Sequence, residues 1–416
     1  MIGLDCVVCD ATYEADYTGY VCRDDGDEGI LDVQYDYEKI GTTLTRESLA
    51  ENHNHTMWRY GPLLPVASDA GVPPLAVGGT PMYHAPTLAA AAGVGRLLVK
   101  DEGRQPTASL KDRASAMAVT KAMESGADVI TTASTGNAAA ALAGMAASVD
   151  LDSVIFVPAS APHPKVAQLL AYGSTVVLVE GSYTDAFGLC MEAAGEYGWY
   201  NRNTGYNPYM TEGKKTAGLE ILEDLGWQSP DAIFVSVGDG SIIGGLHKAV
   251  KDAMALGWID RAPRLFGIQA AGSDYMVQAF ESGENVLTKA PIEADTVADS
   301  ISADLPRDRV KAMAAVTETD GAFLRVSDDE ILAAIPELAR GSGVFAEPAG
   351  AAPYAGLLAA ADQGLVGADD RVVVLATGSG LKDVASAMRA VEAAGTKPIH
   401  VEPSLDALKI SLKGSP

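Results

Sequence analysis

One lysine in this chain stands in a setting that suits covalent chemistry with an aldehyde. Lys111 lies at the start of a predicted helix, 109–125, within the segment Gln105–Arg113, which reads QPTASLKDR. The partial positive charge of a helix N-terminus and the nearby Arg113 guanidinium both disfavour the ammonium form of the lysine. A lysine with a lowered pKa forms Schiff bases with aldehydes. Most helix lysines are solvated surface charges, so Lys111 alone decides nothing.

Three predicted strands end in short loops of glycine and small polar residues. The loops are Ser134–Asn137, Gly238–Ser241 and Thr377–Gly380. In open parallel sheets, ligands bind beyond the carboxyl ends of the strands, often where a Gly-rich turn begins a helix. Each loop alone is weak evidence. Three of them facing one crevice predict a site for a phosphorylated, planar ligand.

The elements that must position these loops alternate between short β-branched runs and helical stretches. The predicted strands are 96–100, 128–133, 153–157, 175–179, 232–237, 265–270 and 371–376. The predicted helices are 109–125, 137–147, 184–197, 213–225, 241–256 and 328–340. Alternation of this kind predicts right-handed βαβ units and parallel sheets covered by helices on both faces.

The motifs together resemble the threonine synthases, which are fold-type II, tryptophan synthase beta-like enzymes dependent on pyridoxal phosphate (PLP). Residues 105–113 are similar to that family's N-P-T-G-S-F-K-D-R lysine motif. Other segments follow in the family's order: Gly79–Pro81, Ala133–Asn137, Glu212–Thr216, Val237–Gly240, Glu347–Ala349 and Thr377–Asp383. The resemblance implies an α/β fold with two lobes and PLP in the cleft between them.

The resemblance also implies a role for each matched residue. Lys111 would hold PLP as a Schiff base and then shuttle protons. Asn137 would bond the ring hydroxyl of the cofactor, although its position also fits a helix N-cap. Thr377 would face the pyridine nitrogen, where a neutral hydroxyl favours elimination and replacement over transamination. We expect Glu347 and Asp383 to be structural caps.

Backbone amides would bind the anionic groups. The substrate carboxylate is expected on the amides of Ser134, Thr135 and Gly136. The PLP phosphate is expected in the cradle that begins the 241–256 helix, formed by Gly238, Asp239, Gly240, Ser241 and Ile242.

Several positions depart from the family pattern. Met210 stands where threonine synthases usually carry an arginine suited to a substrate phosphate. Lys214, which replaces a glutamine, is a candidate substrate ligand that would compensate. Asp239 replaces an asparagine, so we expect its side chain to point away from the bound anion. The stretch 299–304 has no clear family match. Lys100, Arg104 and Lys165 are further candidate anion ligands, each with a solvated surface charge as the alternative.

The leading hypothesis for function is conversion of O-phospho-L-homoserine and water to L-threonine and phosphate by a PLP-dependent lyase. A related enzyme on the same scaffold is the alternative: a cysteate synthase-like β-replacement on O-phosphoserine, or a serine/threonine ammonia-lyase. A catalytically silent binding protein of the same fold is a third reading.

The N-terminal 45 residues predict a small ribbon module. Cys6, Cys9 and Cys22 follow the spacing of zinc ribbons, but the second knuckle reads Cys22-Arg-Asp-Asp25 and lacks a thiolate. Either Asp25 supplies an oxygen ligand to zinc, or the ribbon has lost its metal. We expect residues 46–108 and 200–416 to form the larger, PLP-binding lobe and 109–199 the smaller lobe.

Composition excludes several classes of partner. The 55 acidic and 30 basic residues give a net charge of −25, which repels nucleic acid and anionic membranes. The N-terminus has neither the basic nor the apolar stretch of a secretory signal, and no apolar run is long enough for a membrane helix. The sequence therefore predicts a cytoplasmic enzyme of a small amino-acid substrate, with homo-oligomerisation left open.

Overall fold

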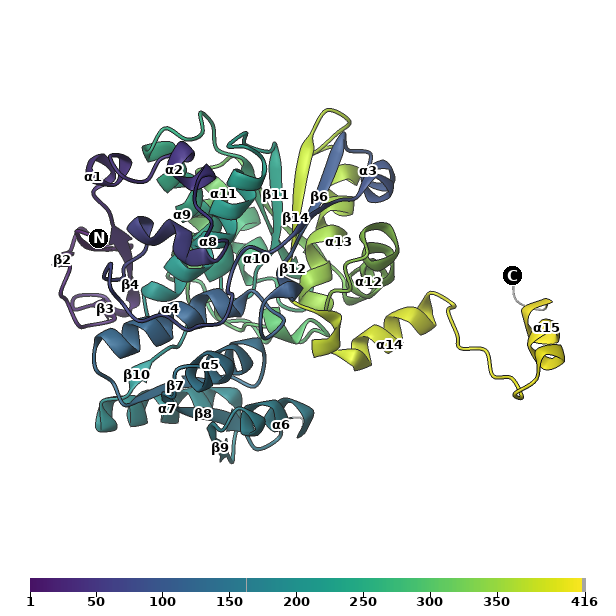
Figure 1. Cartoon of the computed structure of the whole chain (residues 1–416), viewed down its shortest axis with the longest axis horizontal. Helices are drawn as coiled ribbons and strands as arrows, with labels where there is room; N and C mark the ends of the chain where they lie inside the picture. The colour runs from purple at the N-terminus through teal and green to yellow at the C-terminus, as the bar shows by residue number, and fades with distance from the viewer. Residues whose placement is uncertain (162, 414–416) are drawn as a thin grey trace.

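The computed structural model of this chain describes residues 1–161 and 163–413. Three sheets organise the fold: a small antiparallel ribbon at the N-terminus, a four-stranded parallel sheet and a six-stranded sheet. Figure 1 shows the ribbon at one side of the body, with the four-stranded sheet and its helices below the larger lobe. The α/β architecture with parallel sheets covered by helices is confirmed.

The larger sheet has the strand order β13-β12-β11-β14-β6-β5. Its strands are β5 (Met82–His84), β6 (Arg96–Asp101), β11 (Ala232–Ser236), β12 (Arg264–Ala270), β13 (Ala322–Val326) and β14 (Arg371–Ala376). All neighbours are parallel except the edge strand β5, which is antiparallel to β6.

Both faces of this sheet are buried, as its continuous apolar strands require. Leu97 and Val99 pack on one face with α3 (Pro86–Ala92), α12 (Asp328–Ser342) and α13 (Pro348–Asp362). Leu98 packs on the other face with α8 (Tyr209–Asp224), α9 (Ser241–Ala255), α10 (Tyr275–Ser282) and α11 (Arg309–Thr317). Because successive side chains of each strand point to opposite faces, this one sheet contributes to two hydrophobic cores, one on each face.

The smaller sheet has the order β10-β7-β8-β9, and all its neighbours are parallel. Its strands are β7 (Val129–Ala133), β8 (Asp152–Pro158), β9 (Thr175–Val179) and β10 (Tyr200–Asn201). Helices α5 (Asn137–Ala147) and α6 (His163–Ala171) pack on one face and α7 (Tyr183–Tyr197) on the other. Strand β10 lies past residue 199, so this sheet extends beyond the predicted end of the smaller lobe.

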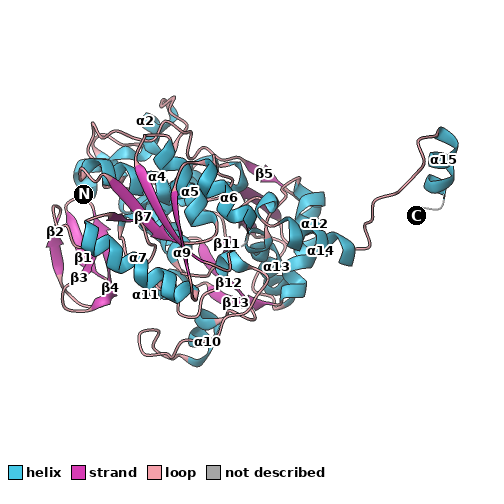
Figure 2. Cartoon of the chain, turned by 90° about the horizontal axis from the view of Figure 1, so that it is seen from below, coloured by secondary structure: helices cyan, strands magenta, loops and turns pink. Residues whose placement is uncertain are grey.

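The N-terminal ribbon is a four-stranded antiparallel sheet of order β2-β1-β4-β3. Its strands are β1 (Gly3–Cys6), β2 (Thr12–Glu14), β3 (Val21–Cys22) and β4 (Gly26–Gln34), grouped at one end of the molecule in Figure 2. The lead-in that follows holds α1 (Tyr37–Gly41), α2 (Arg46–Ala50) and the 3-10 turn η1 (Met57–Leu63).

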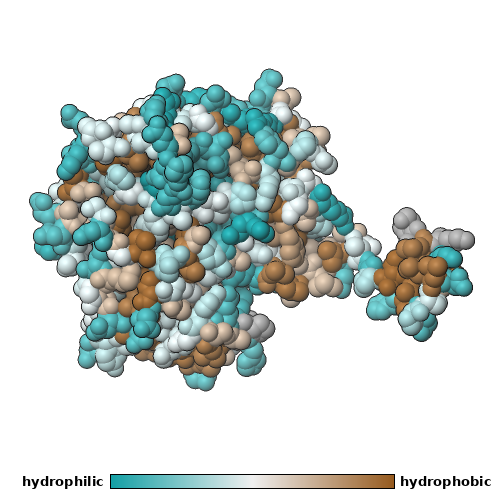
Figure 3. Space-filling model, viewed as in Figure 1, coloured by the Kyte–Doolittle hydropathy of each residue, from teal (hydrophilic) through white to brown (hydrophobic). Residues whose placement is uncertain are grey.

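The remaining elements are α4 (Lys111–Glu124), the 3-10 turns η2 (Glu102–Arg104), η3 (Asp299–Ile301) and η4 (Gly380–Lys382), and the C-terminal helices α14 (Val384–Ala393) and α15 (Leu405–Lys413). Helix α15 lies away from the body in Figure 1, and Figure 3 shows its apolar side chains at the surface. None of the helices within the described residues combines the length and apolar character of a membrane span.

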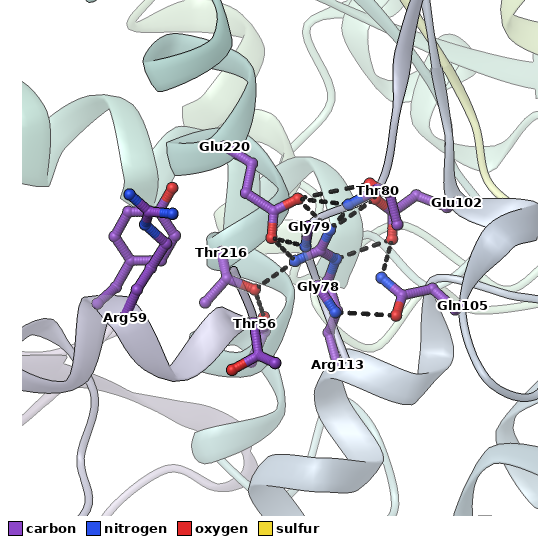
Figure 4. A network of polar contacts seen from close by, with 12 residues as sticks. Thr56, Arg59, Gly78, Gly79, Thr80, Glu102, Gln105, Arg113, Thr216 and Glu220 are labelled. Atoms are coloured by element: carbon purple, nitrogen blue, oxygen red, sulfur yellow. Dashed lines mark hydrogen bonds and ion pairs between the residues drawn. The ribbon is translucent and has the colours of Figure 1, made fainter. Parts of the chain in front are cut away.

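A buried arginine ties the start of α4 to the rest of the fold (Figure 4). The Arg113 side chain is fully buried between two carboxylates, at 2.7 Å from Glu102 and 2.6 Å from Glu220. It also donates to the hydroxyls of Thr216 and Thr80 at 3.0 and 3.2 Å. Charges buried in this way are tolerated only when they are paired and hydrogen-bonded.

The same carboxylates hold the Gly78-Gly79-Thr80 segment, which leads into β5. Gly79 donates its amide to Glu220 at 2.9 Å, and Thr80 donates its hydroxyl to Glu102 at 2.7 Å. Gly78 donates to the Gln105 side chain at 3.0 Å. Two motifs far apart in the sequence thus meet at one ion cluster.

The variant Arg113→Met should be less stable than the native protein by about 3–5 kcal/mol, because it leaves the buried Glu102 carboxylate without a counter-charge and Glu220 with Lys100 alone. Urea unfolding measures the loss. Arg340→Met, which removes an exposed arginine bonded to Thr396, is the control and should change stability by less than about 0.5 kcal/mol. Equal stability of the two variants would contradict this account of the cluster.

Candidate active site

Backbone pairing brings three of the predicted motifs together. The loop 377–380, which follows β14, makes antiparallel bridges on both of its sides. Ser109 pairs with Gly378, and Ala346 pairs with Ser379. The residues before Lys111, the residues before α13 and the loop after β14 therefore form one small sheet-like rim at the carboxyl end of the larger sheet.

This rim depends on close approach between backbones. A Cβ atom at Gly378 would lie 2.3 Å from the Glu347 Oε1 atom, so a larger residue there would displace the Glu347 carboxylate. Ala108 adopts a left-handed conformation with φ of 66°, at the position where the resembling motif has glycine. This chain therefore keeps a strained alanine next to its key lysine.

Lys111 is the first residue of α4 and is partly exposed. Burial lowers the pKa of its amine from the ordinary 10.5, and the nearby Arg202 guanidinium lowers it further. The carboxylates of Asp239 and Glu347 act in the opposite direction. The lowered pKa increases the fraction of neutral amine, which is the nucleophilic form.

Buried cations in the described part of the chain fall into two groups. Lys215 is paired with Glu212 and with Asp252 at 2.5 and 2.8 Å, and Arg113 is paired as described above. Lys214 and Arg202, which are 0% and 1% exposed, form no ion pair within 4.0 Å among the described residues. Burial lowers the pKa of Lys214 well below its usual value, with Lys111 and Arg202 contributing, and burial lowers the pKa of Arg202 to about 10.

An unpaired buried cation indicates a place for an anion. The Nη2 atom of Arg202 is buried and has no hydrogen-bond partner, while Nη1 donates to Thr204 at 2.9 Å and Nε to Ser115 at 3.3 Å. Charge interactions link Arg202 to both Lys111 and Lys214. The three cations therefore surround one region.

The loop after β11 offers a second feature suited to anions. Helix α9 begins at Ser241 after Gly240, whose φ of 95° is accessible to glycine at little cost. The first amides of a helix have no intrahelical partner and bind anions. Lys214 donates to the Ser241 hydroxyl at this point. The Asp239 carboxylate accepts a hydrogen bond from the Arg307 amide at 3.0 Å.

Asn137 and Glu347 form the far wall of the site. Asn137 is the first residue of α5 and does not cap it; its Nδ2 atom donates to Glu347 Oε1 at 2.7 Å. Glu347 precedes α13 but makes no capping hydrogen bond, so its interpretation as a structural cap is wrong. Burial raises the pKa of Glu347 to about 7. Asp383, by contrast, caps α14 by accepting from the Ser386 amide at 3.0 Å.

A pocket lies beside this wall, between the two lobes. Thr135, Gly136 and Asn137 line it from the smaller lobe, and Ser300 and Glu347 from the larger lobe. Ser134 stands at the end of β7, where its hydroxyl accepts from the Gly136 amide at 3.2 Å. The pocket thus presents the predicted carboxylate loop opposite Glu347.

The other candidate anion ligands have separate places. Lys100 is buried and pairs with Glu220 and Asp224 at 3.1 and 3.0 Å, which makes it part of the ion cluster around Arg113. Arg104 is exposed. Lys165 lines the pocket and pairs with Asp299 at 2.5 Å, across the two lobes.

Sequence reasoning missed Arg202 and assigned Glu347, which it had noted, to a capping role. Arg202 follows β10, a two-residue strand too short to recognise from a pattern. The sequence marks Arg202 only as a basic residue between two asparagines, ahead of the Glu212–Thr216 motif. A glutamate is a poor helix cap compared with Ser, Thr, Asp or Asn. The residue type at position 347 therefore already argued against a capping role.

Comparison with known proteins agrees with this geometry. Residues 74–378 match the family described as pyridoxal-phosphate dependent enzyme. The chain belongs to this family. It is 36% identical to threonine synthase of Methanocaldococcus jannaschii, over 98% of each chain, and 37% identical to that of Methanosarcina acetivorans, over 100% of this chain and 99% of the relative.

Solved structures share the fold. Threonine deaminase isoform 2 of Solanum lycopersicum superposes with a TM-score of 0.66 at 24% identity, covering 76% of this chain and 88% of that one. Maize serine racemase superposes with a TM-score of 0.61 at 22% identity, covering 76% and 94%. The fold is therefore that of the fold-type II PLP enzymes, and the chain is a PLP-dependent lyase similar to threonine synthases.

The residues present fit PLP. Lys111 supplies an amine with a lowered pKa, and the start of α9 with Lys214 supplies donors for a phosphate. Two further features suit a ring between the lobes: the Asn137 amide group beside Glu347, and Thr377, which is 6% exposed.

The raised pKa of Glu347 predicts a pH dependence of stability in the apoprotein. The folded state keeps this proton up to a pKa of about 7, whereas the unfolded chain releases it near 4.5. The stabilisation is therefore complete below about pH 4.5 and is lost as the pH rises through about 7.

Native apoprotein should thus lose on the order of 2 kcal/mol more stability between about pH 5 and pH 8 than Glu347→Gln does. Urea unfolding at the two pH values measures this difference. Glu337→Gln, at an exposed position, is the control and should follow the native profile. Parallel profiles for native protein and Glu347→Gln would contradict the assignment.

Proposed function

We propose that this enzyme converts O-phospho-L-homoserine and water to L-threonine and phosphate. The supporting observation is that two buried basic side chains beside Lys111, those of Lys214 and Arg202, form no ion pair among the described residues, which suits a site for more than one anionic group. Full-length similarity to two archaeal threonine synthases points to the same reaction.

The anionic groups would divide among three places. The PLP phosphate would lie on the amides of Gly238–Ile242 at the start of α9, with Lys214 as counter-charge. The substrate carboxylate would lie on the amides of Ser134, Thr135 and Gly136. The substrate phosphate would then bind to Arg202.

Arg202 suits this last role because of its strand position. Strand β10 pairs in parallel with β7, so the residues that follow the two strands lie at the same edge of the sheet. The Arg202 amide donates to Thr131 at 2.9 Å, which places Arg202 beside the strand that leads into Ser134. Met210 is fully buried in an apolar cluster with Tyr209 and cannot serve a phosphate. In this chain, Arg202 would replace the family arginine.

Bound PLP supplies an electron sink that acidifies the hydrogens next to the substrate's amino-bearing carbon. Lys111 lies where a neutral amine can take protons from Cα and then from Cβ and return them later in the reaction. Arg202 would hold the phosphate in line to leave from Cγ and stabilise its charge. Water then adds at Cβ, which gives one threonine and one phosphate for each substrate and water consumed.

Purified, PLP-loaded protein should release phosphate from O-phospho-L-homoserine and form threonine in equal amounts. Lys111→Ala should abolish both, since Lys111 would be the residue that binds PLP and moves the protons, whereas Lys214 is held at Ser241. A colorimetric phosphate assay with amino-acid chromatography measures the two products. Phosphate release from O-phosphoserine with a nucleophile, or ammonia release from serine or threonine, in place of threonine formation would shift the assignment to the alternatives.

Arg202→Met should lower kcat/KM for O-phospho-L-homoserine on the order of 100-fold, because a charge-assisted contact to the phosphate is lost. Its visible absorbance from lysine-bound PLP should remain, and inhibition by inorganic phosphate should weaken. Arg261→Met, at an exposed arginine paired with Asp231, is the control. An unchanged kcat/KM in Arg202→Met would rule out this role.

A further inference from the structure

The N-terminal ribbon brings together four side chains that the reaction does not use. Cys6 ends β1, Cys9 lies in the turn that follows, Cys22 lies in β3, and Asp25 lies in the turn before β4. One ligand atom from each residue lies within 4.8 Å of every other. The three cysteines are free, so no disulfide connects them.

The distances within this cluster fit a metal at its centre. Cys9 Sγ and Cys22 Sγ are 3.7 Å apart, and Cys6 Sγ is 3.3 Å from Asp25 Oδ2. A tetrahedral zinc with Zn–S bonds of about 2.3 Å and a Zn–O bond of about 2.0 Å sets these separations at about 3.8 and 3.5 Å. A disulfide would require about 2.05 Å between the two sulfurs.

The surroundings support thiolate ligands. Val8 donates its amide to Cys6 Sγ at 3.4 Å, and Tyr13 donates its hydroxyl to Cys22 Sγ at 3.2 Å. Hydrogen bonds of this kind orient metal ligands and tune their basicity. Gly29 faces the cluster: a Cβ there would lie 2.4 Å from Cys22 Cβ and 2.7 Å from Asp25 Cβ. Glycine at position 29 therefore leaves room for Cys22 and Asp25 to approach the other ligands.

We propose that Cys6, Cys9, Cys22 and Asp25 bind one zinc ion in a closed, structural site. Four protein ligands leave no open position for substrate, so the metal does no chemistry. Asp25 takes the place of the thiolate that is missing from the second knuckle. A ribbon of this size buries little apolar surface, and a metal is a usual way to stabilise such a module.

The metal would also steady one wall of the active site. Tyr20, two residues before Cys22, accepts a hydrogen bond from the Asn201 amide at 3.3 Å. Its ring lies against those of Tyr200 and Tyr206, with centroids 5.7 and 5.3 Å away. Arg202 stands within this segment. Loss of zinc should therefore loosen the Arg202 backbone, an effect on catalysis that rests on the proposed function.

Elemental analysis of the full-length protein, purified without added metal or chelator, tests the site directly. We expect about one zinc per chain, and less than about 0.1 per chain in Cys9→Ser and in Asp25→Ala. Matched controls are Cys190→Ser, which changes the buried cysteine of the smaller lobe, and Asp24→Ala, which changes the neighbouring aspartate; both should keep zinc. Cobalt exchanged into the site should show the intense visible bands of tetrahedral thiolate coordination.

A second variant covers the case in which loss of a ligand unfolds the ribbon. Asp25→Cys completes a four-thiolate set, so it should retain zinc and release it to a chelator at least about tenfold more slowly than the native protein. Native protein that holds no zinc and takes up none from zinc chloride would overturn the proposal. So would zinc that remains in Cys9→Ser and Asp25→Ala, or a Cys9–Cys22 disulfide in the protein purified under reducing conditions.

Discussion

The ion cluster around Arg113 is the constraint on which the active site depends. Its guanidinium joins α4, which begins with Lys111, to Glu220 on α8 and to Glu102 after β6. Helix α8 also carries Lys214, so one buried arginine fixes the spacing between the amine and the phosphate cradle. Burial raises the pKa of Glu220, but the Arg113 and Lys100 cations outweigh burial and hold this pKa at about 2, so that the carboxylate stays charged at neutral pH. Removing Arg113 leaves the buried Glu102 carboxylate unpaired, which is strongly unfavourable.

The arrangement separates charges that build the fold from charges that serve a ligand. Lys100, Arg113 and Lys215 are neutralised by carboxylates within about 3 Å. Lys214 and Arg202 are buried just as deeply but have no carboxylate in ion-pair range in the described part of the chain. Folding therefore carries an electrostatic cost at the site that bound anions relieve. This contrast, more than any single contact, supports the proposal that the site binds more than one anionic group.

Much of the fold could be predicted from the sequence, because its signals are local. The β-branched runs and the helical stretches between them appear close to their predicted bounds, and the Gly-rich loops lie at the strand ends. What could not be predicted depends on contacts between distant residues. Arg202 is buried beside β10, a strand of only two residues that is too short to recognise from a sequence pattern. The Asn137–Glu347 hydrogen bond joins residues on different lobes. Likewise, the sequence left Lys100 open as an anion ligand, because its partners Glu220 and Asp224 lie far along the chain.

The central claim is that this scaffold prepares Lys111 as a neutral amine before the cofactor arrives. The most direct test is the pH dependence of the rate at which apoprotein captures PLP, followed by its visible absorbance, with Lys111→Ala as the blank. Because burial and Arg202 lower the pKa of Lys111, the midpoint of the rate profile should lie below the ordinary lysine pKa of 10.5. A rate that keeps rising to a midpoint near 10.5 would show an ordinary solvated lysine and contradict the account.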